Sequence, residues 1–181
     1  IAWGITVLMC IGFQKDLGAA IVFTCIVMAT LFIAGAPIRW MATMTGAFTI
    51  VSLGQMVNVC KGAIEVSGID AELIDLATIV PWDRQSVLES VKKTGRLVVV
   101  EEAPLSGGWG SEILAATTSK LFSSLKAAPF RITTPDVPVP YSGTLEARYI
   151  PTAQDIARQL TESLKNGLTP KQWWEIEGLG S

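Results

Sequence analysis

The chain has 181 residues, half of them hydrophobic, and a formal net charge of −2. That charge gives no support to nucleic-acid binding, which normally needs a basic face. The sequence contains no histidine, which removes the commonest general base and excludes a Ser-His-Asp or Cys-His arrangement within this chain. The cysteines at 10, 25 and 60 are odd in number and far apart. They are interpreted as small hydrophobic residues in a reduced setting, not as a disulfide framework or a zinc site.

The first 47 residues differ from the rest of the chain because they carry only three charges: Lys15, Asp16 and Arg39. Residues 17–38 form an uncharged apolar run. As a helix it would be roughly 33 Å long at ~1.5 Å per residue, enough to cross the hydrocarbon core of a bilayer. We therefore expect a membrane helix over 17–38, and membrane association if residues 1–47 are retained. A buried core helix is the alternative.

A local motif in this segment carries a resemblance to a known family. The sequence QKDLGAA at 14–20 overlaps the start of the apolar run, and LFIAGAPIRW at 31–40 spans its end. It resembles the SEDS group (shape, elongation, division and sporulation) of membrane glycosyltransferases, which build peptidoglycan and have the pattern Q-P-D-x-G-T. Lys15 stands where that family has proline, and Ala19 where it has threonine. The resemblance implies a fragment without an active site. One alternative function is therefore a membrane fragment related to these cell-wall enzymes, or an artefactual fusion near residue 48.

From about Thr49 the pattern becomes that of an α/β domain. The predicted strands are Thr49–Leu53, Ala71–Leu76, Arg96–Val100 and Phe130–Thr133. The predicted helices are Gln55–Val66, 81–93, 111–125 and 152–165. Strands that alternate with helices of this length predict an open, mostly parallel sheet with helices on both faces. Gly68 and Gly95 suit helix C-termini, and Asp83 suits an N-cap.

A second resemblance covers about Thr49–Leu164. It rests on IDAELIDLATIVPWDRQSVLESVKKTGRLVVVEEAPLSGGWGSEI and on RITTPDVPVPYSGTLEARYIPTAQDI. These segments resemble the transketolase C-terminal domain, more narrowly that domain in the beta subunit of thiamine-diphosphate-dependent 2-oxo acid dehydrogenases of the pyruvate or branched-chain type. The implied organisation is an apolar segment at 1–47, a transketolase C-terminal-like domain at 48–166 and a tail at 167–181.

The resemblance implies a role in subunit assembly within an oxidoreductase complex. The pyrimidine-binding domain that precedes this domain in such subunits is not found in the sequence. We therefore expect the chain alone to be inactive and to bind no cofactor, with thiamine diphosphate held elsewhere in the complex. The implied partners are the alpha subunit, a second beta subunit and the dihydrolipoyl acyltransferase core. The C-terminal domain is expected to be cytoplasmic.

No catalytic, cofactor-binding or metal-ligating residue is predicted, but three segments are candidates for contact with a partner. The candidate interface residues are Glu101, Glu102, Trp109, Asp136, Pro138 and Tyr141. The adjacent glutamates end the third strand, where α/β folds place ligands. One interpretation is that both carboxylates form an acidic surface patch that faces a partner. The alternative is that one glutamate caps the next loop and the other is solvated.

The other two candidate segments are loops. The glycines of Gly107-Gly108-Trp109-Gly110 suit a tight turn before a helix, with Trp109 at a subunit contact, more than they suit an anion site. The prolines of DVPVPY (136–141) keep this segment extended, so it is either a docking surface or a rigid connection, and the resemblance favours docking. Trp173 and Trp174, in the tail, anchor a partner or lie on the protein's own surface; the sequence does not decide.

Overall fold

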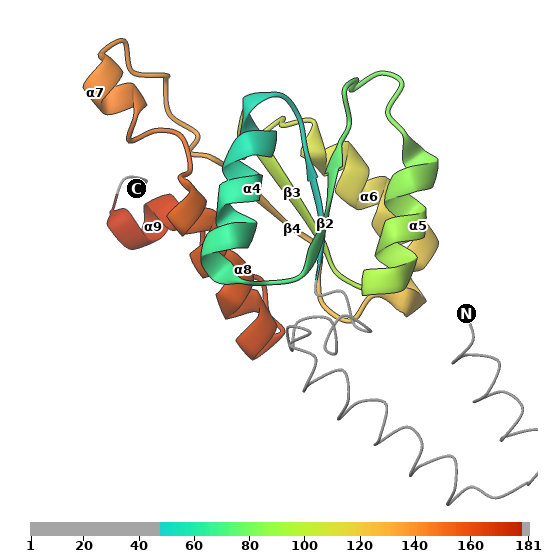
Figure 1. The fold of residues 1–181 in the computed structure, drawn as a ribbon. Helices are drawn as coiled ribbons and strands as arrows, with labels where there is room; N and C mark the ends of the chain where they lie inside the picture. The colour runs from blue at the N-terminus through green and yellow to red at the C-terminus, as the bar shows by residue number, and fades with distance from the viewer. Residues whose placement is uncertain (1–47, 179–181) are drawn as a thin grey trace, which may run out of the picture. The chain divides into compact units, whose positions relative to one another are not determined.

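The computed structural model describes residues 48–178 (Figure 1). The chain divides into two units, Ile1–Met44 and Thr45–Ser181, and the second contains all the described elements. The predicted membrane helix at 17–38 and the SEDS-like motif lie outside the described residues. Between residues 48 and 178, no helix has the length and apolar character needed to cross a membrane.

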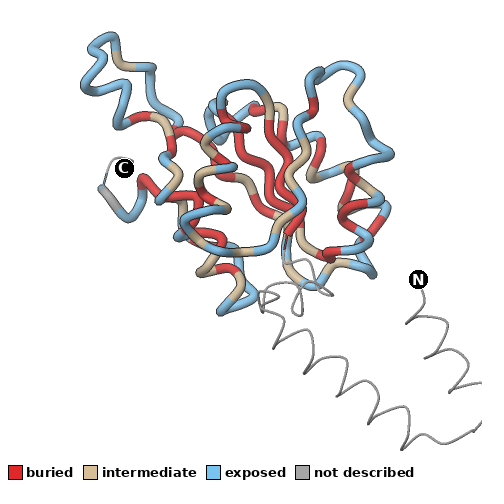
Figure 2. The backbone as a smooth tube through the Cα atoms, viewed as in Figure 1, coloured by how far each residue is buried: buried red, intermediate tan, exposed pale blue. Residues whose placement is uncertain are grey.

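Four parallel strands form one sheet in the order β2-β1-β3-β4. Their bounds are β1 Phe48–Ser52, β2 Ala71–Asp75, β3 Leu97–Pro104 and β4 Phe130–Thr134. The two central strands, β1 and β3, are buried along their apolar runs, as expected for a parallel sheet covered on both faces (Figure 2). The predicted open parallel α/β fold is therefore confirmed.

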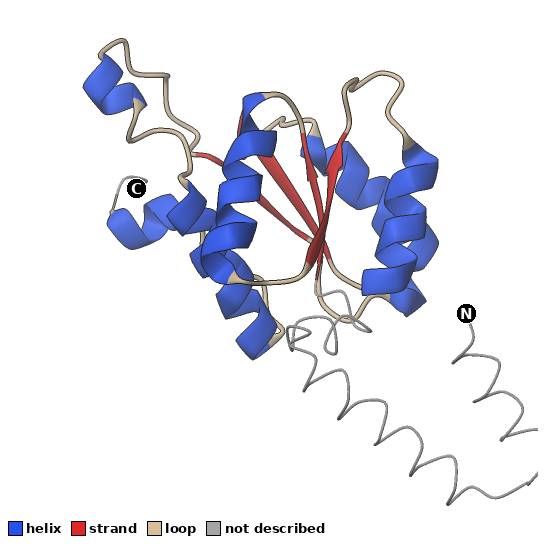
Figure 3. Ribbon diagram, in the orientation of Figure 1, coloured by secondary structure: helices blue, strands red, loops and turns tan. Residues whose placement is uncertain are grey.

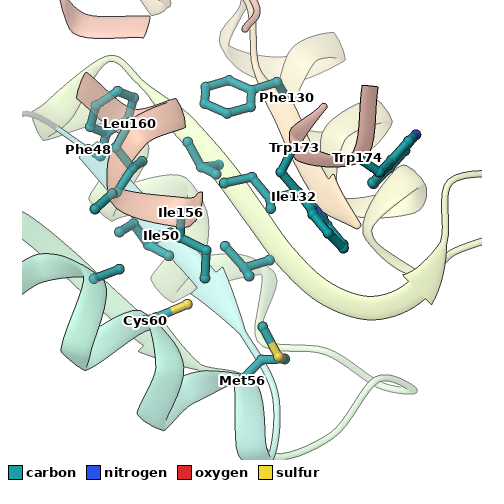
Figure 4. Close-up of a cluster of buried hydrophobic side chains, with 14 residues drawn as sticks. Phe48, Ile50, Met56, Cys60, Phe130, Ile132, Ile156, Leu160, Trp173 and Trp174 are labelled. Carbon is teal, nitrogen blue, oxygen red and sulfur yellow. The ribbon is translucent and has the colours of Figure 1, made fainter. Parts of the chain in front are cut away.

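The helices cover the two faces of the sheet in pairs (Figures 1 and 3). One face carries α4 (Gln55–Ser67) and α8 (Ala153–Asn166), and the other carries α5 (Arg84–Thr94) and α6 (Gly110–Leu121). Successive residues of a strand point to opposite faces. Along β3, Val98 and Val100 accordingly pack in the core under α4 and α8, whereas Leu97 and Val99 pack under α5 and α6. Figure 4 shows the first of these cores.

Local signals set the ends of the helices. Asp83 caps α5, where its carboxylate accepts a hydrogen bond from the backbone N–H of Ser86 at 3.1 Å. Gly68 and Gly95 end α4 and α5 with φ values of 64° and 74°, in the left-handed region that glycine tolerates best. These three predicted caps are confirmed.

Two short helices and one strand extension were not predicted. The four-residue helix α7 is Gly143–Glu146, and the five-residue helix α9 is Trp173–Glu177. Strand β3 continues beyond the predicted end at Val100 to Pro104. The predicted helix at 111–125 is instead α6 followed by a 3₁₀ turn, η2 (Phe122–Ser124).

The segment that follows α8 is anchored to the folded core through its two tryptophans. Trp173 and Trp174 are only 2% and 5% exposed. Both belong to the core formed by α4, α8 and the sheet (Figure 4). Neither the partner anchor nor the surface position considered for these tryptophans therefore agrees with the structure.

Candidate interface at the carboxyl edge of the sheet

The candidate interface residues lie at the edge of the sheet where all four parallel strands end. Its three longer loops are residues 76–83 after β2, 105–109 after β3 and 135–152 after β4, the last of which contains α7, while the loop after β1 is only residues 53–54. We call this surface the carboxyl edge. Open α/β sheets usually bind ligands and partners at this edge, because the loops there can vary without disturbing the strands.

Glu101 is buried under the carboxyl edge and does not face outward. Its side chain is fully enclosed and forms an ion pair with Arg131 of β4, with Nη1 and Oε1 3.0 Å apart. Its second carboxylate oxygen accepts a hydrogen bond from the backbone N–H of Gly110 at 3.0 Å. The carboxylate therefore joins β3, β4 and the first residue of α6, and it is not available to a partner in this fold.

Glycines 108 and 110 allow the loop to lie directly against this ion pair. A Cβ added to Gly108 would lie 2.8 Å from Glu101 Oε1, and one added to Gly110 would lie 2.7 Å from it. Cβ atoms in real structures essentially never lie less than 3.0 Å from such a neighbouring atom, so neither position accepts a side chain without a shift. The N-terminus of α6 thus already holds an anionic group, the chain's own Glu101 carboxylate. The N-terminus is the favoured place for negative charge on a helix. Because the Glu101 carboxylate already occupies it, an external anion is not expected to bind here.

The electrostatics of Glu101 combine opposing effects. Burial raises the pKa of the Glu101 carboxyl, while the Gly110 N–H and the Arg131 guanidinium both act to lower it. Burial is the largest of these effects, since it disfavours the charged form. Arg131 also donates from Nη2 to the carbonyl of Leu105, so one guanidinium holds both the carboxylate and the loop above it.

A second set of hydrogen bonds ties the loop after β3 to the loop after β4. The carboxylate of Asp136 accepts from the backbone N–H of Ser106 at 2.8 Å and bonds with the Ser106 hydroxyl at 2.7 Å. These two bonds are the main cause of the lowered pKa of Asp136. Asp136 is exposed, yet its position is fixed. The first residue of the DVPVPY segment is therefore held in a fixed position relative to the loop after β3.

The loops after β2 and β3 enclose an apolar groove of about 630 Å³. It is lined by Leu76, Ile79, Val80, Pro81, Trp82, Arg84, Trp109, Glu112 and Ile113. At its rim the Arg84 guanidinium lies 5.2 Å from the ring centre of Trp82 and 3.3 Å from the carboxylate of Glu112. Trp109 is half-buried and packs beside the core under α5 and α6. Trp109 therefore packs against this core and also lines the groove.

Exposed apolar side chains concentrate at the carboxyl edge. Seven large ones lie on its three loops: Ile79, Val80, Leu105, Val137, Val139, Tyr141 and Leu145. Val80 is 90% exposed and Tyr141 is fully exposed. The loops that carry them are pale blue along most of their length in Figure 2, around the buried strands. A concentration of exposed apolar side chains at one edge of a domain is a feature of surfaces that bind a partner.

The predicted interface residues thus fall into three groups. Glu102, Asp136, Pro138 and Tyr141 are exposed, Trp109 is half-buried and Glu101 is buried. The ion-pair partner Arg131 and the groove residues Val80 and Trp82 were not predicted from the sequence. A signal for Arg131 was present, because a charged residue in a short strand needs a partner within reach. Within residues 48–178, no group of three or more His, Cys, Asp or Glu side chains is placed to hold a metal ion.

Comparison with known proteins agrees with this architecture. Residues 45–156 match the family described as transketolase, C-terminal domain. The chain belongs to this family. The match leaves out the first 44 residues, and nothing in the comparisons supports their resemblance to SEDS glycosyltransferases.

Three similar proteins show the context of this transketolase C-terminal domain. The chain is 42% identical over 122 residues to the acetoin:2,6-dichlorophenolindophenol oxidoreductase subunit beta of Cupriavidus necator, covering 66% of this chain and 36% of that protein. It is 43% identical over 120 residues to the pyruvate dehydrogenase E1 component subunit beta of Mycoplasma pneumoniae, covering 61% and 36%. A solved structure described as "Split gene transketolase, inactive beta4 tetramer" aligns with a TM-score of 0.54 and 30% identity, covering 67% and 39%. The chain therefore spans little more than a third of the length of these relatives.

Proposed function

We propose that this chain supplies a subunit-assembly domain of a thiamine-dependent 2-oxo acid dehydrogenase, as a beta-subunit component of an oxidoreductase complex of the pyruvate dehydrogenase type. The observation that carries the proposal is the concentration of exposed apolar side chains, seven in all, on the loops of the carboxyl edge. The proposal assigns no catalytic residue to the described part of this chain.

The carboxyl edge has the physical properties of a docking surface. The DVPVPY segment is stiff because proline fixes φ, and its Asp136 is tied to Ser106 in the loop after β3. A preorganised loop loses little conformational entropy when it binds. Its exposed residues Val139 and Tyr141 would bury apolar area against a partner, and the release of that area from water is favourable.

The identity of the proposed partners comes from the relatives. Two of them are beta subunits by name, and the solved relative is a tetramer. These names support assembly with other subunits, and we propose an alpha subunit and a second beta subunit as partners. The dihydrolipoyl acyltransferase core as a third partner, and a cytoplasmic location, are proposed from the resemblance of residues 49–164 to 2-oxo acid dehydrogenase beta subunits. Thiamine diphosphate would be held by the assembled complex, outside the residues described here.

The test is assembly of the chain with the remaining parts of a related enzyme. The chain, tagged, would be co-expressed with the pyruvate dehydrogenase E1 alpha subunit of Mycoplasma pneumoniae and with its beta subunit truncated before the matching region. We expect a stable complex in sedimentation experiments. A double substitution Val139→Ser/Tyr141→Ser should weaken it at least tenfold, a loss of ~1.4 kcal/mol.

The matched control is Phe122→Ser. Phe122 is also exposed and aromatic, but it follows α6 at the opposite end of the sheet. It should leave the complex unchanged. If no complex forms, or if Phe122→Ser weakens it as much as the double substitution does, the carboxyl edge is not the assembly surface.

A further inference from the structure

Strand β4 is at the outer edge of the sheet, and half of its backbone groups point away from β3. The carbonyl of Thr134 accepts from the N–H of Leu105, which follows β3, so Thr134 faces its neighbouring strand. Successive residues of a strand direct their backbone groups to alternate sides. Arg131 and Thr133 therefore direct theirs outward, to the edge where a further strand would pair.

The segment 167–178, which we call the C-terminal strap, bonds to these outward carbonyls. Gln172 donates from Nε2 to the carbonyl of Arg131 at 2.9 Å. Trp173 donates from its indole Nε1 to the carbonyl of Thr133, also at 2.9 Å. Two neighbouring side chains thus bond to alternate residues of β4. A paired strand would use backbone N–H groups for the same purpose.

The strap is itself firmly attached to the domain. Gln159 of α8, which is fully buried, donates from Nε2 to the carbonyl of Lys171 at 2.7 Å. The rings of Trp173 and Trp174 pack edge to face, with centres 5.8 Å apart and an angle of 85° between them. Figure 4 shows both rings beside Ile132 of β4. The strap lies beyond residue 156, where the family match ends.

We propose that the C-terminal strap is a cap that prevents β4 from pairing with β4 of a second copy of this chain. Unpaired edge strands present rows of hydrogen-bonding groups that recruit other strands. The strand sequence FRITT is rich in residues that favour extended structure. A second copy offers the same row of groups, so it is the occupant that fits this edge. The proposal is independent of the carboxyl edge and of the function proposed above.

The test removes the two donors from the full chain while keeping apolar bulk in their place. The variant Gln172→Met/Trp173→Phe lacks both side-chain N–H groups, and Trp174→Phe is the control that removes an indole N–H from the same helix. All proteins would be kept in one mild detergent, because residues 1–47 are strongly apolar. Self-association would be measured by sedimentation equilibrium. A fluorescent peptide with the β4 sequence PFRITTP would be used to measure strand binding by anisotropy.

We expect the double variant to self-associate at least tenfold more tightly than the wild type and to bind PFRITTP but not a scrambled peptide. The control should behave as the wild type does. Trp173→Phe alone, a milder change, should give an intermediate result if the double variant fails to fold. The proposal is overturned if the folded variants lose thermal stability without gaining association or peptide binding. It is equally overturned if the wild type binds the peptide as well as they do.

Discussion

Gly110 is the residue at which close packing under the carboxyl edge is most easily tested. In Gly110→Ala the new methyl group would lie 2.7 Å from both Glu101 Oε1 and Val99 Cγ1, so buried groups would have to move. Overpacking of this kind typically costs 1–3 kcal/mol, and we expect a loss of about 2 kcal/mol in the free energy of unfolding. Urea denaturation followed by circular dichroism would measure it.

Gly143→Ala is the matched control for this substitution. No heavy atom lies within 4 Å of a Cβ placed at Gly143, which is the first residue of α7. Its φ is not in the left-handed region. The control should therefore be neutral or slightly stabilising. Equal destabilisation by both substitutions would mean that the contact with Glu101 is not the cause.

Cys60 is expected to be chemically inert in the folded protein. It is buried in the core between α4 and the sheet, and burial raises the pKa of its thiol from 9.0 to about 11, against a smaller lowering effect of Ser52. Thiolate is the reactive form. At pH 8 iodoacetamide should leave the peptide containing Cys60 unmodified in mass spectrometry, whereas the urea-unfolded chain should react at this position.

The raised pKa of the Cys60 thiol also makes the stability of the folded protein depend on pH. Because folding raises the thiol pKa, the stability gained from the neutral thiol is complete below pH 9.0 and is lost as the pH rises through about 11. Modification of native Cys60 at pH 8 as fast as in the unfolded chain would show that the core opens there.

At the scale of elements, the pair Ser106–Asp136 should couple the loops after β3 and β4. The two bonds from Ser106 lower the pKa of Asp136, so their stabilising effect is present above the ordinary aspartate pKa. It is lost as the pH falls through the lowered pKa. In Ser106→Ala the hydroxyl bond disappears and the backbone bond remains. We expect the pKa of Asp136 to rise part of the way toward its ordinary value in a carbon-detected NMR titration.

The control for this titration is Ser119→Ala, since Ser119 is an exposed serine on α6 that bonds to the carbonyl of Ala116. Its substitution should leave Asp136 unchanged. An unaltered Asp136 pKa in Ser106→Ala would indicate that the two loops are not coupled in solution.

Elements whose signals are local were predicted well. The strands and main helices followed from apolar periodicity, and Asp83, Gly68 and Gly95 marked helix ends because capping depends on a few neighbouring residues. The parallel direction of the strands, though not their order in the sheet, also follows from alternating strands and helices. The helix ends and the individual strands and helices were therefore predictable from short-range chemistry.

What could not be predicted depends on contacts between distant segments. Trp173 lies in the core only because β4 and α8 create a place for it, and a helix of five residues carries no periodic signal. Glu101 looks like a solvated residue in sequence, but Arg131, thirty positions away, neutralises it. The exposed members of the candidate site, such as Tyr141, were identifiable from the proline-rich pattern, whereas their support beneath the surface was not.

At the scale of the whole chain, we expect no thiamine diphosphate binding and no dehydrogenase or decarboxylase activity from this polypeptide alone. The family match is confined to one domain of much longer relatives, and the sequence has no histidine. Isothermal titration of the chain with thiamine diphosphate and Mg²⁺ should show no saturable heat, with the assembled complex described above as the positive control. Saturable micromolar binding by the chain alone would contradict this expectation.

Arg131 has a consequence for the order in which mutations can accumulate in this domain. Its guanidinium compensates the buried carboxylate of Glu101, and its carbonyl accepts the bond from Gln172. If Arg131 is replaced first, a buried negative charge remains without its partner, which is strongly destabilising. If Glu101 becomes neutral first, the arginine keeps its bond to the carbonyl of Leu105 and its side chain, which is 11% exposed, retains some contact with water, so the cost is smaller. We therefore expect lineages that lose this pair to pass through a neutral residue at position 101, so that evolutionary change here runs in one direction more easily than in the other.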